Sequence, residues 1–267
     1  MSYPIRLAET LAPQISLIIP VVNEARALGA TLDLLLAMPG LLEIIVVDGG
    51  SVDATVAIAR GRGVRQLSAN RGRGIQMHAG AQSALGDIFW FVHADTHPPA
   101  DAARRIQDCL ARPNVSGGCF AVRFDGTSRP ASFLTWFYSR LCRLGLCYGD
   151  AAMFMRRIDY ERAGGFRPFP LFEDVDLVQR LRRRGRFVCL TAEVVASSRR
   201  FEGRSFVLTF AWWVVLQLLY WLGVPPRFLG RMYAPIRTRP RMRSPTPRLK
   251  PGKVSSTEVS QPCVVRG

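Results

Sequence analysis

The chain has 267 residues, which is enough for one large α/β domain with a substantial core but too few for two full-sized domains. Its formal net charge is +16, and arginine supplies nearly all the positive charge because Lys250 and Lys253 are the only lysines. Such a balance indicates anionic partners, namely nucleic acid, an anionic membrane surface or phosphorylated substrates. The arginine clusters at 182–184 and 199–200 lie near a long apolar segment, and no nucleic-acid-binding motif with interleaved aromatic residues is present. We therefore expect phosphates of a membrane or a substrate as partners, and no nucleic acid.

The six cysteines are scattered, with no CxxC pair and no histidine at zinc-site spacing. This pattern favours reduced, mostly buried thiols over a disulfide framework or a zinc site. An N-terminal extension, residues 1–14, has no apolar core long enough for a signal peptide. Both features predict a catalytic part that stays in the cytosol.

Two consecutive units of strand, loop and helix begin the chain. The apolar run Ile15–Pro20 precedes a leucine-rich helix over Ala25–Ala37, and the run Leu42–Val47 precedes a helix over Ala54–Arg60. Repeated units of this kind predict a parallel sheet.

The loops of these two units contain the first candidate site residues. Asp48 stands at the carboxyl end of its strand, where open α/β sheets bind ligands, and Gly49 lets the backbone approach a ligand closely. Asn23 and Glu24 are equally well explained as a helix cap and a favourable first-turn charge, and Asp53 is better explained as a cap. The pattern is not GxGxxG, so a Rossmann dinucleotide site is not indicated.

A third strand over Val64–Leu67 leads into the basic, glycine-containing loop Asn70–His78 and a helix that ends near Gly86–Asp87. Arg71, Arg73 and Gly74 in this loop could cradle phosphates, although such a run is also typical of an ordinary solvated loop.

The apolar run Ile88–Val92 predicts a strand buried on both faces. His93 and Asp95 follow it at the carboxyl edge of the sheet, where Asp95 could hold a metal ion or a phosphate-bearing substrate. A simple turn before Pro98 is the alternative.

The middle of the chain continues the α/β pattern, with a helix over Pro98–Ala111 and a strand over Gly118–Phe124. The aromatic segment Ala131–Tyr148 contains two arginines and is better interpreted as an amphipathic helix than as a membrane span. Strand character returns over Gly149–Arg157, and a helix begins at Asp159.

Glu173, Asp174 and Asp176 lie within four positions, ahead of a basic helix over Val178–Arg184. The helix dipole explains one or two of these carboxylates. The dipole does not explain why the carboxylates lie beside apolar Leu171. That position favours a role for one of them as a general base.

A last strand over Phe187–Ser198 precedes residues 206–224, which carry no charge and as a helix would be roughly 28 Å long. This apolar helix, placed in a segment 204–236, could span a membrane, lie at its interface or pack against a partner subunit. Residues 237–267 have the composition of a disordered basic tail.

Six marks in order carry a resemblance: Ile18–Pro20 with Asn23–Glu24, Val46–Ser51, Arg71–Gly74 with Gly86–Asp87, His93–Asp95, Gly149–Asp150 and Glu173–Asp174. The sequence resembles a family 2 glycosyltransferase of the GT-A fold, most similar to the bacterial selenodomain-associated transferase branch, over about Ile15–Tyr233. The resemblance implies an α/β fold with a mostly parallel central sheet, with the catalytic domain at 15–203.

The resemblance also implies roles for individual residues. Asp174 would be the catalytic base, supported by Glu173, and Asp95 would bind a divalent ion, Mg²⁺ or Mn²⁺. A nucleotide-sugar donor would contact residues that lie in four loops: Pro20, Asn23, Glu24, Asp48, Gly49, Arg71, Arg73, Gly74 and His93. The implied reaction is an inverting sugar transfer to an unidentified, possibly lipid-linked acceptor at the cytoplasmic face of the membrane.

Two departures and two alternatives accompany this interpretation. His93 stands where the family pattern Asp-x-Asp has its first aspartate, and Arg199-Arg200-Phe201 only faintly resembles the Gln-x-x-Arg-Trp motif of processive members. A nucleotidyltransferase would need a glycine-rich triphosphate loop with a lysine near the N-terminus, and no lysine precedes Lys250. A non-catalytic membrane-bound binding protein would not need Asp48, Asp95 and Asp174.

Overall fold

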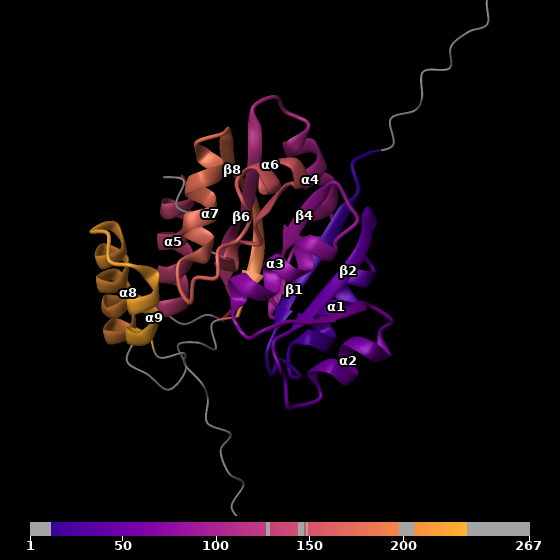
Figure 1. The fold of residues 1–267 in the computed structure, drawn as a ribbon, viewed down its shortest axis with the longest axis horizontal. Helices are drawn as coiled ribbons and strands as arrows, with labels where there is room; N and C mark the ends of the chain where they lie inside the picture. The colour runs from indigo at the N-terminus through magenta and orange to yellow at the C-terminus, as the bar shows by residue number, and fades with distance from the viewer. Residues whose placement is uncertain (1–11, 127–128, 144–146, 148, 198–205, 234–267) are drawn as a thin grey trace, which may run out of the picture. The chain divides into compact units, whose positions relative to one another are not determined.

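A computed structural model describes residues 12–126, 129–143, 147, 149–197 and 206–233 (Figure 1). The expected tail, most of the N-terminal extension and Arg199–Phe201 lie outside these residues. The described part begins with alternating strands and helices: β1 Ile15–Val21, α1 Leu28–Leu36, β2 Leu41–Asp48, α2 Thr55–Gly61, β3 Arg65–Ser68, α3 Arg73–Ser83 and β4 Ile88–Phe91. The strands and helices predicted for this half are confirmed, with boundaries displaced by a few residues.

The second half alternates less regularly. Its elements are β5 Thr96–His97, α4 Ala102–Leu110, β6 Val115–Phe124, α5 Arg129–Arg143, the 3-10 helix η1 Gly149–Ala151, β7 Phe154–Arg156, α6 Arg157–Arg162, α7 Glu173–Arg182, β8 Arg186–Ala196, α8 Phe206–Trp221 and α9 Pro226–Met232. The strand expected over residues 149–157 is therefore wrong in its first part. There, a turn of 3-10 helix precedes the short strand β7.

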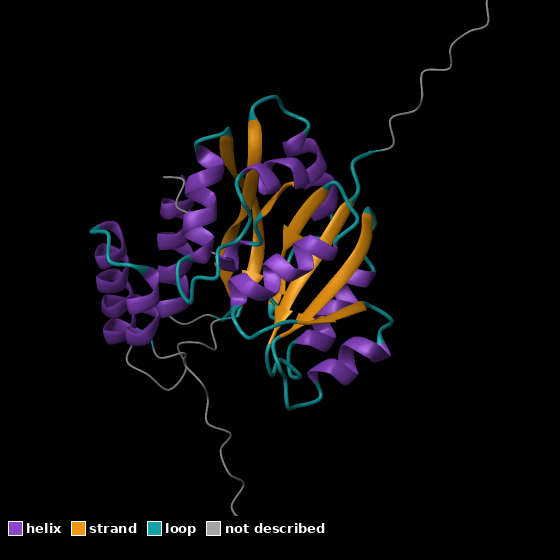
Figure 2. Cartoon of the chain, in the orientation of Figure 1, coloured by secondary structure: helices purple, strands orange, loops and turns teal. Residues whose placement is uncertain are grey.

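One mixed sheet of eight strands organises the molecule, in the order β3-β2-β1-β4-β7-β6-β8-β5. Strands β1 to β4 pair in parallel, as the repeated units predict, and β6 pairs in parallel with β8. The short strand β7 runs antiparallel to both β4 and β6 and joins the two parallel groups. Figure 2 shows the helices packed around this central sheet. The sheet is thus mixed, although parallel pairs predominate.

The apolar runs of the sequence form the centre of the sheet. Every residue of β4 is buried, and Trp90 is fully enclosed, with its ring 6.0 Å from that of Phe120 on β6. The indole Nε1 of Trp90 donates a hydrogen bond to the carbonyl of Ala152 (3.2 Å), which fixes the chain before β7 beside β4. The segment Gly149–Ala151 is thereby placed next to the residues that follow β4.

The apolar helix predicted over residues 206–224 is present as α8 but ends at Trp221. One face of α8 packs on the rest of the described protein, where Leu216 joins Phe172, Val175 and Leu229 in a small apolar cluster. Figure 1 shows α8 and α9 side by side, next to α5. Within the described part of the chain, no helix is long and apolar enough to cross a membrane.

Candidate active site

The loops after β1 and β2 are joined to each other at the carboxyl edge of the sheet. The carboxylate of Asp48 accepts hydrogen bonds from the backbone N–H groups of Gly50 and Ser51, each at 3.1 Å. Asn23, in the left-handed region with φ 57°, accepts a hydrogen bond at Oδ1 from the backbone of Val52 (2.8 Å). Asn23 therefore links the two loops, with Pro20 near the end of β1 and Glu24 next to Asn23 in the loop that follows.

Gln76 on α3 holds the ends of both strands and is a residue whose role the sequence did not reveal. Its buried Nε2 donates to the carbonyls of Val21 (2.9 Å) and Val47 (2.8 Å). A Cβ on Gly49 would lie 2.9 Å from the Gln76 side chain, so glycine is required there by close approach. No signal in the sequence marks this role, because the burial of Gln76 follows from the way α3 crosses the two strands.

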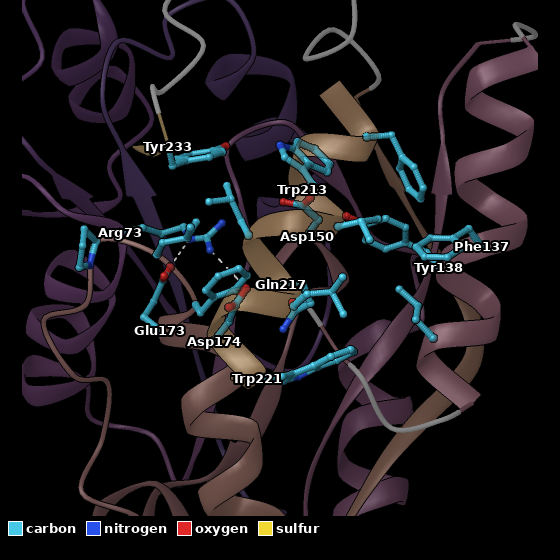
Figure 3. Close-up of a pocket in the computed structure, with 18 residues that line it drawn as sticks. Arg73, Phe137, Tyr138, Asp150, Glu173, Asp174, Trp213, Gln217, Trp221 and Tyr233 are labelled. Atoms are coloured by element: carbon cyan, nitrogen blue, oxygen red, sulfur yellow. Dashed lines mark hydrogen bonds and ion pairs between the residues drawn. The ribbon is translucent and has the colours of Figure 1, made fainter. Parts of the chain in front are cut away.

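Arg73, Glu173 and Asp174 come together from the first turns of α3 and α7 (Figure 3). The Nε of Arg73 donates to Oε1 of Glu173, and its Nη2 lies 3.2 Å from Oδ2 of Asp174. Glu173 and Asp174 are buried, whereas 33% of the Arg73 side chain is exposed. The two candidate catalytic carboxylates therefore share one guanidinium at the surface of the sheet edge.

The backbone around this group is tightly fitted. Gly74 packs so closely that an added Cβ would lie 3.0 Å from the side chain of Glu173. Phe172, immediately before α7, is held at φ 64°, a left-handed conformation that costs a non-glycine residue free energy. Burial alone would lower the pKa of Arg73, but the charges of Glu173 and Asp174 outweigh burial and raise that pKa. The guanidinium thus stays charged beside both carboxylates.

Asp176, the third carboxylate of the run, is part of a separate ion-pair group. Its Oδ2 accepts from Nη2 of Arg180 at 2.5 Å, and its Oδ1 lies 3.2 Å from Nη1 of Arg167. We therefore assign Asp176 to holding α7 and the loop before it, and not to the candidate site.

Asp95 lies in a turn whose backbone is fixed from two sides. The hydroxyl of Thr31 on α1 donates to the carbonyl of Ala94 (2.6 Å), and Thr96 pairs with Ala196 of β8. Asp95 and Asp150 line one small pocket, and Nε2 of His93 lies 3.7 Å from Oδ1 of Asp150. Asp150 is thus a second carboxylate near Asp95 that the sequence analysis named as a family mark but gave no role.

The donor set around Asp95 suits a hard divalent cation. Such an ion binds through one or two carboxylates and takes waters and substrate phosphates as its other ligands. Asp95 and Asp150 offer carboxylates of this kind. The sulfurs of Cys119, Cys142 and Cys189 also lie close together, but Cys142 and Cys189 are joined by a disulfide, so this group does not offer three ligands to such an ion. The residues present at Asp95 therefore fit Mg²⁺ or Mn²⁺ as an ion shared with a phosphate-bearing ligand.

The expectation that the cysteines are all reduced is wrong for two of them. Cys142 on α5 and Cys189 on β8, 47 positions apart, form a disulfide. Sequence spacing could not reveal this contact because α5 and β8 meet only in the folded sheet. The Sγ of Cys119 lies 3.4 Å from that of Cys142. Burial and a hydrogen bond with Cys119 raise the pKa of the Cys147 thiol well above its ordinary value.

A cavity of about 380 Å³ opens beside Asp174. Its walls come from α5, α8 and the segment before α7, and Arg73, Asp150 and Glu173 join Asp174 at its polar end (Figure 3). Arg71, by contrast, is exposed and makes none of the contacts described above.

The fold and this site define a class of protein. A mixed sheet with carboxylates after β2 and β4, a buried Glu-Asp pair and an adjoining cavity is the architecture of a GT-A-like transferase. The family model of glycosyl transferase family 2 matches residues 16–162, more than half of the chain. The protein belongs to this family, and it is therefore a glycosyltransferase, which transfers a sugar from a nucleotide-sugar donor.

Solved structures of similar fold include a mannosyltransferase, PcManGT from Pyrobaculum calidifontis, in complex with GDP-Man and Mn²⁺. It has a TM-score of 0.61 and 20% sequence identity, over 85% of this chain and 67% of its own. Glucosyl-3-phosphoglycerate synthase from Mycobacterium tuberculosis, with Mn²⁺, UDP and glucosyl-3-phosphoglycerate, has a TM-score of 0.57 and 20% identity, over 80% of this chain and 81% of its own. At such identities the likeness shows the fold alone. No curated protein matches the chain.

Proposed function

We propose that the protein is a metal-dependent, inverting glycosyltransferase in which Asp174 is the catalytic base. The observation that carries this proposal is the position of Asp174. Its buried carboxylate is held by Arg73 at 3.2 Å and forms part of the wall of a cavity large enough for an acceptor. Glu173 shares the same guanidinium and supports the orientation of Asp174.

The donor would bind along the carboxyl edge of β1, β2 and β4. The base and ribose would contact the ends of β1 and β2 and the two loops after them, which Gln76 and Asn23 tie together: Pro20, Asn23, Glu24, Asp48 and Gly49. Arg71, Arg73, Gly74 and His93 complete the proposed donor-binding set on the phosphate side. The similar mannosyltransferase and glucosyl-3-phosphoglycerate synthase were solved with GDP-Man and with UDP, which supports a nucleotide-bearing donor.

Asp95, with Asp150 nearby, would hold the divalent ion. The ion supplies positive charge that stabilises the developing charge of the departing diphosphate. The similar structures contain Mn²⁺ or Mg²⁺, which supports this assignment.

The chain's own residues account for the acceptor half of the reaction. The carboxylate of Asp174 takes the proton from the acceptor hydroxyl while the hydroxyl oxygen bonds to the anomeric carbon. The bond from that carbon to the diphosphate oxygen breaks, and the nucleoside diphosphate leaves from the opposite face, which inverts the anomeric centre. The guanidinium of Arg73, 3.2 Å from the Asp174 carboxylate, orients that carboxylate between turnovers.

The substitution Asp174→Asn tests this assignment. General-base catalysis contributes about 10²–10⁴-fold, so kcat should fall by that range. Donor affinity, measured by calorimetry with Mn²⁺, should stay within a few-fold. Asp176→Asn on the same helix is the comparison variant, because Asp176 pairs with Arg167 and Arg180 and should affect stability more than turnover. Full turnover in Asp174→Asn would remove Asp174 from the mechanism.

We also propose that the enzyme works at a membrane surface, on the cytoplasmic face, and that it belongs to the selenodomain-associated branch. Exposed apolar side chains support the surface assignment, namely Val207 and Leu208 on α8 and Leu222 just after it, as do the neighbouring cations Arg227 and Arg231. Co-sedimentation with vesicles of anionic and of neutral lipid tests it. If the protein binds neither kind of vesicle, the proposal that it works at a membrane surface is wrong.

A further inference from the structure

The cavity beside Asp174 is mostly apolar, although the reacting groups at its end are charged. Phe137 and Leu141 of α5 face the cavity from one side, and Phe210, Val214 and Leu218 of α8 line it from another. In Figure 3 the rings of Trp213 and Trp221 lie on either side of Gln217, with Asp174 beside it. A volume of about 380 Å³ lies within the range of small-molecule sites, about 300–1,000 Å³.

The charges in the cavity wall discriminate between classes of acceptor. Among the described residues that line the cavity, Asp150, Glu173 and Asp174 contribute three carboxylates, and Arg73 contributes the one guanidinium. That guanidinium is already paired with Glu173 and Asp174. The proposed ion at Asp95 and Asp150 would serve the donor diphosphate, so no described lining residue offers a further cation to a phosphate on the acceptor, whereas a neutral hydroxyl would meet the carboxylate of Asp174.

The body of the acceptor is constrained by the walls. A free sugar carries a hydroxyl on nearly every carbon and would lose hydrogen bonds to water on entering an apolar cavity. A hydrocarbon chain or ring would instead gain about 0.8 kcal/mol for each buried methylene, equivalent to about fourfold in affinity. The observed lining therefore suits an amphiphile with one reactive end.

We infer that the acceptor is a neutral alcohol with an apolar body, whose hydroxyl reaches Asp174 while its hydrocarbon part lies between α5 and α8. This inference rests on the proposed function and names the acceptor class of the same site. The product is the corresponding glycoside, formed with release of the nucleoside diphosphate, and the hydroxyl proton passes to Asp174.

Transfer assays with graded acceptors test the inference. The full-length protein with Mn²⁺ and a donor selected from a sugar-nucleotide panel would be given butanol, octanol and dodecanol, with octyl phosphate and methyl glucoside as comparisons. We expect kcat/KM to rise by up to about fourfold per methylene until the cavity is filled. The kcat/KM for octanol should exceed the values for octyl phosphate and for methyl glucoside. Hexadecanol in neutral vesicles then shows whether the alcohol is taken from solution or from a bilayer.

Two variants of α8 make the test specific. Leu218 lines the cavity and is 49% exposed, so Leu218→Glu is tolerated by the fold but puts charge into the path of the chain. Val215 lies on the same helix, is 41% exposed and does not line the cavity, so Val215→Glu is the matched control. We expect KM for octanol to rise at least about tenfold in the first variant and to stay unchanged in the second.

Binding can be measured without turnover. A brominated alkanol, 11-bromoundecanol, should quench tryptophan fluorescence, and Trp213→Phe combined with Trp221→Phe should remove most of the quenching. Trp212→Phe, which changes a neighbouring residue outside the cavity, should not. Donor hydrolysis without dependence on chain length, or preference for octyl phosphate, would overturn the inference and leave the proposed function standing. Quenching without any donor binding would instead reject the proposed function, and with it the role of the alcohol as acceptor.

Discussion

Arg73 and Asp174 are 101 positions apart in the sequence, yet Nη2 of Arg73 lies 3.2 Å from Oδ2 of Asp174. This ion pair connects the first turn of α3, where we place donor phosphates, to α7, the helix that carries the proposed base. The donor side and the acceptor side of the site are therefore coupled through one guanidinium.

Replacing Arg73 with Gln should impair both stability and turnover. It would leave two buried carboxylates without their cation, which costs about 3–5 kcal/mol in a fully buried pair. Because a third of the Arg73 side chain is exposed, we expect the free energy of unfolding, measured with denaturant, to fall by about 2 kcal/mol. Arg73→Lys should be intermediate, since lysine retains the charge but not the forked geometry.

Arg104→Gln is the control for this prediction, because Arg104 is 84% exposed and its ion pair lies on the surface of α4. Surface pairs contribute about 0–1 kcal/mol, so stability should hardly change. An equal loss in free energy of unfolding in Arg73→Gln and Arg104→Gln would show that the ion pairs of Arg73 stabilise the protein no more than a surface pair does.

Asp95→Ala should weaken donor binding that depends on the metal ion. Loss of the carboxylate should lower Mn²⁺-dependent donor affinity by about tenfold or more, since even indirect changes around metal sites cost about 10–100-fold. Calorimetry with and without Mn²⁺ measures this difference. Asp101→Ala, at an exposed ion pair with Arg105, is the control. Donor affinity in Asp95→Ala that equals the wild-type value, with and without Mn²⁺, would refute the metal role.

The fold was predictable where the sequence pattern is local. The apolar run at β4 predicts a strand buried on both faces, and each residue from Ile88 to Phe91 is buried. Asp95 follows at the carboxyl edge of the sheet, as expected for the residues after a parallel strand.

The rest of the site depends on contacts between distant segments, which no local pattern encodes. Asp150 comes beside His93 because Trp90 binds the carbonyl of Ala152. Gln76 reaches the ends of β1 and β2 only because α3 crosses them. The Cys142–Cys189 disulfide likewise requires α5 to pack next to β8. Sequence reasoning could name Asp174 as a candidate base, but not the guanidinium that holds it.

Stability should depend on pH through His78. Its Nδ1 lies 2.8 Å from the Tyr160 hydroxyl, and burial lowers the pKa of His78 below its ordinary value of 6.5. The unfolded state therefore takes up a proton more readily than the folded state. The contribution of neutral His78 to the free energy of unfolding is therefore present above pH 6.5. It is lost as the pH falls from 6.5 through the lower pKa of His78 in the folded state.

Thermal unfolding between pH 7.5 and pH 5 tests the role of His78. His78→Gln should flatten the decline in melting temperature at acidic pH. At neutral pH the variant should lose about 1 kcal/mol in free energy of unfolding, because the hydrogen bond to Tyr160 is weakened. His97→Gln changes an exposed histidine and should leave the decline unaltered. A decline that is the same in all three proteins would assign the acid sensitivity to other groups.

The Cys142–Cys189 disulfide should stabilise the wall of the cavity beside Asp174. It ties α5, which supplies Phe137, Tyr138 and Leu141 to that wall, to the sheet strand β8. Closing a loop of 47 residues is worth about 4 kcal/mol in the chain-entropy model, or about 10 °C in melting temperature for a domain of this size.

Dithiothreitol should therefore lower the melting temperature of the wild-type protein. In the double variant Cys142→Ala with Cys189→Ala, the melting temperature should be low from the outset and insensitive to the reductant. If the wild-type protein melts at the same temperature with and without dithiothreitol, the disulfide makes no contribution to stability, and packing alone holds α5 in place.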